Sequence, residues 1–216
     1  MLNMFVRKFL DPAYRAKWFH SMAMALLVLT LSLPTAAIGT DPAAAQVVEK
    51  LHAELLEVMK KAKALGYKGR YQRLAPLVAS SYDFPFISKL VVGRYWSEFS
   101  LEQKEQFVNT FTKLSIATYA NQFAGYSGEH FKTISAEDST RGRLLIKTVL
   151  IKSNGEEVEL DYMLHQKEGQ WQIINVIAQG VSDLSLKRAQ YTSCLKKEGF
   201  DALLQRLNEK IKSYQG

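Results

Sequence analysis

The segment EEVELDYMLHQKEGQWQIINVIA, residues 156–178, decides the fold class of this chain. Over residues 156–166, apolar residues alternate with acidic or polar ones, which predicts a β-strand with one buried face and one wet face. Glu168-Gly169 is a turn signal, and residues 170–180 predict a second strand that is apolar on both faces. The segment therefore predicts an antiparallel hairpin.

Two more strands are predicted immediately upstream, over residues 130–136 and 142–152. The turn signal Ser153-Asn154-Gly155 joins the second of them to the hairpin. Because successive hairpins place neighbouring strands antiparallel, we expect a curved four-stranded meander. In its last strand, simple alternation separates two apolar sets, with Trp171, Ile173 and Ile177 on one face and Ile174, Val176 and Ala178 on the other.

Helical periodicity fills the chain on both sides of the strands. A cap at Asp41-Pro42 begins the first predicted helix, and the capping box Ser100-Leu-Glu-Gln103 begins the longest one. In chain order, the helical segments are 41–66, a short pair that ends at Gly93, 100–123, 182–197 and 201–212. The order of helices, strands and helices favours an α+β fold with the helices packed on one face of the sheet.

Residues 1–45 have the layout of a secretory signal. Basic residues precede an apolar run over residues 22–33, and small residues follow it through Ala45. The run is shorter than the roughly 20 residues that span a bilayer, so we expect a signal peptide cleaved near residues 37–45. An uncleaved N-terminal tether is the alternative, and in either case residues 46–216 form one exported domain.

Charge and cysteine content exclude several classes of protein. The chain has 28 Lys and Arg against 21 Asp and Glu, a formal net charge of +7. This mild excess suits an anionic membrane surface or an acidic partner. The basic residues are interspersed with acidic ones and form no long run, so nucleic-acid binding is not expected. Cys194 is the only cysteine, so no intramolecular disulfide can form, and we expect it on an apolar helix face.

The sequence offers little catalytic machinery. Asp161 and Tyr162 are adjacent in a predicted strand and point to opposite faces, so they cannot share one pocket. The four histidines have no metal-ligand spacing. His20 lies in the predicted signal, and the other three are expected at the surface or partly packed: His52, His130 and His165. We therefore expect that the protein is not an enzyme and that it binds no metal ion and no cofactor.

Aromatic residues are concentrated between residues 82 and 123. Aromatic stripes at helical spacing usually pack against other helices, which favours a solid core. The same residues would also line a hollow interior. The residues alone leave both possibilities open.

Four segments carry a resemblance to a known family: SYDFPFISKLVVGRYW at 81–96, QFVNTFTKL at 106–114, YSGE at 126–129 and QWQIINVIAQGVS at 170–182. Together and in this order, they resemble the MlaC-type periplasmic lipid carriers, also called toluene-tolerance or Tgt-type auxiliary components of lipid ABC transport. The resemblance extends over nearly all of residues 46–212. Residues 180–204 are more similar to the hopanoid-associated branch, HpnM, than to the phospholipid branch.

This resemblance implies that the helices and sheet enclose a hydrophobic cavity for lipid tails and that the protein catalyses no covalent chemistry. The implied ligand is a hopanoid or a phospholipid. The implied partners are an inner-membrane lipid exporter, RND-type or MCE-type, and an outer-membrane acceptor. The candidate pocket residues are Phe84, Phe86, Leu90, Val91, Phe107, Phe111, Leu114, Tyr162, Ile174, Val176 and Leu184.

Arg94, Lys187 and Arg188 are candidates for contact with an anionic head group or with a partner. Arg94 lies inside the best-matched segment. Ordinary solvated charge is the competing interpretation of all three. Two other functions also remain open, a lipid-modifying enzyme that uses the same pocket and an envelope adaptor that binds no lipid.

Overall fold

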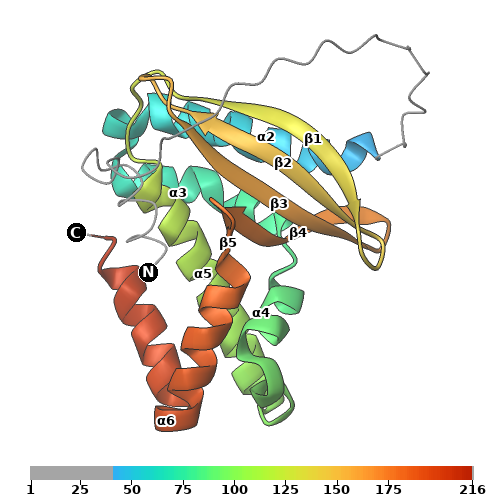
Figure 1. Ribbon diagram of the computed structural model, residues 1–216. Helices are drawn as coiled ribbons and strands as arrows, with labels where there is room; N and C mark the ends of the chain where they lie inside the picture. Colours follow the sequence, from blue (N-terminus) through green and yellow to red (C-terminus); the bar gives the residue numbers. More distant parts are fainter. Residues whose placement is uncertain (1–40, 216) are drawn as a thin grey trace, which may run out of the picture.

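The structure is a computed structural model, and it describes residues 41–215 (Figure 1). Residues 1–40 of the predicted signal therefore lie outside the described residues. The helices are α2 (Pro42–Lys60), α3 (Ala62–Ser81), α4 (Phe84–Val92), the 3₁₀ helix η2 (Gly93–Ser97), α5 (Leu101–Gln122) and α6 (Asp183–Lys212). The strands are β1 (His130–Ser139), β2 (Arg143–Ile151), β3 (Glu157–Lys167), β4 (Gln170–Ala178) and β5 (Val181–Ser182). The predicted α+β class is confirmed.

The sheet is an antiparallel meander in the order β1-β2-β3-β4-β5. The prediction of four strands was wrong, because a short fifth strand follows β4. Gln179 and Gly180 both have positive φ, 50° and 74°, so the chain reverses in a tight turn and Val181 pairs with Ala178. Positive φ at both central residues is typical of the two-residue turns that connect antiparallel strands.

The predicted alternation of side chains in β4 was also wrong, because this strand contains a bulge. Leu164 pairs with Ile173 and Met163 pairs with Asn175, so Ile174 is an extra residue between the two pairs. The extra residue reverses the alternation that follows it. Ile173 therefore shares a face with Val176 and Ala178, not with Ile177.

The starts of α2 and α5 follow the caps in the sequence, but the predicted helix over residues 41–66 was wrong at its end, because α2 stops at Lys60 and α3 runs on from Ala62 through a kink at Gly66. The Asp41 carboxylate accepts a hydrogen bond from the backbone N–H of Ala43 at 2.9 Å, and α2 begins at Pro42. Folded structure thus starts before residue 46, and Ala44 is fully buried. At α5, the Ser100 and Gln103 side chains each bond the other's backbone N–H, at 3.1 and 3.0 Å, which confirms the predicted capping box.

Helix α6 consists of two arms that meet at Gly199, where φ is 82° and ψ is −174°. This backbone conformation is essentially restricted to glycine, so Gly199 sets the position of the kink. Figure 1 shows the two arms folded back beside each other below the sheet. The predicted break between helices at Glu198-Gly199 is confirmed as this kink.

The core joins the sheet to the helices. Helix α2 contacts β1, β2 and β4, and buries Val48, Leu51 and Leu55 completely. Helix α5 packs against α3, α4 and α6, while α4 and α6 also contact β4. This arrangement brings α5, both arms of α6 and the strands β3 and β4 around one interior space.

Candidate functional site

A pocket of about 1000 Å³ lies between α5, the two arms of α6 and the sheet. Its wall is mainly apolar and includes Phe84 of α4, Phe111 and Leu114 of α5, and Val176 of β4. This volume is at the upper end of the roughly 300–1,000 Å³ typical of ligand sites. A space large enough for a ligand therefore remains between these elements.

Helix α5 presents a stripe to this pocket that changes from apolar to polar along the helix. Phe111 and Leu114 are followed at helical spacing by Ser115, Thr118 and Gln122, and all five line the pocket. The hydroxyls of Ser115 and Thr118 donate to the carbonyls of Phe111 and Leu114, at 2.9 and 2.8 Å. Both hydroxyl donors are therefore already hydrogen-bonded within the helix.

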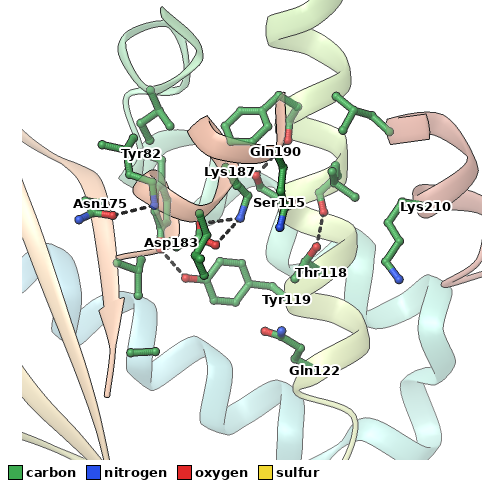
Figure 2. A pocket seen from close by; sticks show the side chains of 18 of the residues that line it. Tyr82, Ser115, Thr118, Tyr119, Gln122, Asn175, Asp183, Lys187, Gln190 and Lys210 are labelled. Carbon is green, nitrogen blue, oxygen red and sulfur yellow. Dashed lines mark hydrogen bonds and ion pairs between the residues drawn. The ribbon is translucent and has the colours of Figure 1, made fainter. Parts of the chain in front are cut away.

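Two tyrosines form a polar contact within the wall. The hydroxyls of Tyr82 and Tyr119 are hydrogen-bonded to each other (Figure 2). Burial raises the pKa of both phenols, so both stay neutral across the physiological range. This pair adds hydrogen-bonding capacity to the wall without adding charge.

A third tyrosine is held from behind the pocket. The Tyr162 hydroxyl bonds to Nε2 of His52 at 3.0 Å, and the His52 ring stacks on Phe131 with ring centroids 3.9 Å apart. Burial lowers the pKa of His52 to about 3, so the imidazole is neutral at pH 7. His52 is only 4% exposed, so the expectation of a surface or partly packed histidine was wrong for this residue.

Charged groups of the pocket are gathered mainly on α6. The Lys187 ammonium pairs with Asp183 at 2.5 Å, and Arg206 pairs with Glu198 at 2.5 Å. Lys197 and Lys210 also line the pocket, and the Lys210 ammonium lies 4.8 Å from the centre of the Tyr214 ring. The pocket thus combines an apolar wall with a charged border.

The comparisons with known proteins agree with this geometry. A family model described as MlaC protein matches residues 49–209. The chain belongs to the MlaC family. This confirms the family to which the four segments pointed.

Two relatives of this MlaC-family chain have curated names. The intermembrane phospholipid transport system binding protein MlaC of Haemophilus influenzae is 26% identical, over 89% of this chain and 92% of its own length. The toluene tolerance protein ttg2D of Pseudomonas putida is 25% identical, over 82% of this chain and 83% of its own length.

One solved structure is similar to this MlaC-family fold. It is the phospholipid-binding protein of Ralstonia solanacearum, solved in complex with a phospholipid. The TM-score is 0.70 at 21% identity, and the match covers 80% of this chain and 99% of the other. At that identity, the likeness shows the fold.

The structure places seven of the eleven candidate pocket residues on the wall: Phe84, Phe111, Leu114, Tyr162, Ile174, Val176 and Leu184. Phe86, Leu90, Val91 and Phe107 do not line it. Phe107 lies behind the wall, where its ring contacts Phe111 and Tyr191, with centroids 6.0 and 6.1 Å away. Phe86 instead packs on His165 with ring centroids 4.6 Å apart.

Only one of the three candidate head-group residues lies on the pocket wall. Lys187 lines the pocket, but Arg94 and Arg188 do not. Arg94 is exposed on η2 and donates to the Tyr95 hydroxyl at 3.2 Å. The Arg188 guanidinium lies against Gly93, the residue before Arg94, so these two arginines come from neighbouring positions away from the pocket wall.

Sequence reasoning missed several wall residues, notably Ser115, Thr118, Lys197 and Lys210. Their polar or charged side chains gave no reason to place them in a lipid pocket. Cys194 was expected on an apolar helix face, and it is buried and lines the pocket.

Residues 41–215 contain no group of three or more His, Cys, Asp or Glu side chains that could hold a metal ion. Among the helices of the same range, none has both the length and the apolar character needed to cross a membrane.

Proposed function

We propose that this chain is a periplasmic carrier that binds a phospholipid in the pocket and moves it between the inner and outer membranes without altering it covalently. The observation that carries this proposal is the roughly 1000 Å³ pocket with a mainly apolar wall in a member of the MlaC family. The relatives support it, since one is named as the binding protein of a phospholipid transport system.

The energetics of lipid transfer explain why such a pocket is useful. Exposing two acyl chains of about 15 methylenes each to water costs roughly 25 kcal/mol, an upper-end figure. A barrier of that height limits unaided desorption to on the order of 10⁻⁶ per second. The apolar wall offers the tails an alternative to water, so the tails are proposed to lie against Phe111, Leu114 and Val176.

The remaining candidate residues have proposed roles outside the pocket. Phe107 supports the wall from behind. Arg94 is proposed to contact a partner, because it is exposed on η2 and lies outside the pocket wall. The proposed partners are an inner-membrane lipid exporter, RND-type or MCE-type, and an outer-membrane acceptor.

A hopanoid is the second candidate ligand, supported by the similarity of residues 180–204 to the hopanoid-associated branch. A rigid fused-ring body loses less conformational entropy on entering a preformed cavity than flexible chains do. The names of the two relatives and of the solved structure favour a phospholipid.

Organic extraction of the purified protein followed by mass spectrometry tests the proposal. We expect intact phospholipid in a fixed ratio to protein. Intact hopanoid would reassign the ligand, and chemically altered lipid would favour the lipid-modifying enzyme. A protein that carries no lipid and takes none from vesicles would contradict the carrier and favour the envelope adaptor.

A further inference from the structure

The charged side chains on the pocket wall are not evenly balanced. Five are basic and three are acidic: Lys152, Lys187, Lys197, Arg206 and Lys210 against Glu129, Asp183 and Glu198. An apolar wall cannot discriminate between lipids that have the same tails. These charged residues are the groups on the wall that can distinguish head groups by their net charge.

Three of the five cations are already neutralised by a carboxylate. Lys152 pairs with Glu156 at 3.0 Å, Lys187 with Asp183, and Arg206 with Glu198. Each such pair has little net charge to offer a ligand, because the carboxylate offsets the charge of its cation.

Lys197 and Lys210 differ from these three. Within residues 41–215, neither forms an ion pair with a carboxylate. Lys197 is exposed near the end of the first arm of α6, and Lys210 is half-buried on the second arm. Figure 2 shows Lys210 on the side of α5 opposite to Lys187 and Asp183. The two unpaired cations thus border the pocket from two separate arms.

We propose that Lys197 and Lys210 select lipids whose head group has a net negative charge over zwitterionic lipids with the same tails. This inference rests on the proposed function, because it assumes that the apolar part of the ligand occupies the pocket. With the tails against Phe111 and Leu114, a phosphodiester at the border of the pocket is attracted by whichever of the two ammonium groups it lies near, and neither group has a competing carboxylate. A head group that carries its own cation gains less, because its positive charge offsets the attraction.

Two neighbouring lysines provide a matched control. Lys196 and Lys212 are exposed on the same two arms, and neither lines the pocket. The pocket variant is Lys197→Gln with Lys210→Gln, and the control variant is Lys196→Gln with Lys212→Gln. Both variants lose two positive charges, so an effect of overall charge on docking at vesicles is the same in both.

The experiment is an internal competition. The full chain, stripped of lipid, is incubated with vesicles that contain equal amounts of phosphatidylglycerol and phosphatidylcholine with the same acyl chains. The protein is then reisolated and the ratio of the two bound lipids is measured by mass spectrometry. We expect the wild type and the control variant to favour phosphatidylglycerol by about threefold to tenfold at low salt, and the pocket variant to bring the ratio close to one.

Each other outcome has a definite meaning. A wild-type ratio of one, or equal changes in both variants, would overturn the inference while leaving the carrier function intact. Failure of every protein to take up either lipid would contradict the carrier function itself. Free phosphate offers the same chemistry as the head group. Binding of inorganic phosphate to the lipid-free protein that is lost in the pocket variant alone, together with a wild-type lipid ratio of one, would assign the lysines to a free anion and overturn the lipid selectivity.

Discussion

Thr118→Trp should block the pocket without unfolding the protein. Thr118 is half-buried on α5 and lines the pocket, and its hydroxyl is bonded only to the Leu114 carbonyl of its own helix. An indole in its place occupies part of the roughly 1000 Å³ that the tails would otherwise use. A tryptophan side chain provides about 150–250 Å² of surface, and a comparable apolar area of the ligand is displaced.

At about 25 cal/mol per Å², that displacement costs about 4–6 kcal/mol of binding free energy. The expected loss of lipid affinity is therefore about a thousandfold or more. The assay is uptake of a phospholipid with a fluorescent acyl chain from vesicles, measured after the protein has been separated from them. Circular dichroism and thermal unfolding should be close to those of the wild type.

Thr112→Trp is the matched control for this experiment. Thr112 is also a half-buried threonine of α5 whose hydroxyl donates to a carbonyl four residues earlier, that of Val108, at 2.8 Å. It does not line the pocket, so its variant should take up lipid normally. Normal uptake by Thr118→Trp, or equal losses in the two folded variants, would refute the reasoning.

Three further changes test other parts of the structure. His52 has a pKa of about 3 in the folded protein and about 6.5 in the unfolded chain, so the unfolded chain binds the proton first and stability falls as the pH drops below about 6.5. Between pH 7 and pH 5, the free energy of unfolding measured in urea should fall by about 2 kcal/mol more for the wild type than for His52→Gln. Equal losses would show that His52 does not titrate this way. Gly199→Ala should reduce the free energy of unfolding by about 1–3 kcal/mol because alanine is strained at φ 82°, and an unchanged urea midpoint would contradict the assigned role of the kink. Arg94→Ala should weaken lipid transfer to an acceptor membrane while leaving the fold and the amount of bound lipid unchanged, and unaltered transfer between donor and acceptor vesicles would argue against its partner role.

The strands and caps were predictable because their signals are local. The alternation over residues 156–166 and the capping box at Ser100 depend only on near neighbours in sequence, and both appear as expected. The bulge at Ile174 depends on the register against β3, which the β4 sequence alone does not contain. The turn at Gln179-Gly180 escaped notice because its first residue adopts a positive φ although it is not glycine.

The pocket could be predicted only in part, because its wall depends on packing between distant segments. Phe107 and Phe111 are four residues apart on one stripe of α5, yet only Phe111 lines the pocket. Phe99 and Tyr191, which come from other segments, contact the Phe107 ring and are part of what covers it. Lys187 and Arg188 are a different case, since one step along a helix turns a side chain by about 100°, and local periodicity alone indicates that they cannot both face the site.

The central claim is that lipid tails occupy the space between α5, α6 and the sheet. A phospholipid with a photoreactive group in its acyl chain tests this most directly, with the crosslinked residues mapped by mass spectrometry. We expect crosslinks to wall residues such as Phe111, Leu114 and Val176. Crosslinks confined to outward-facing residues such as Ile134, which is 53% exposed on β1, would contradict the claim.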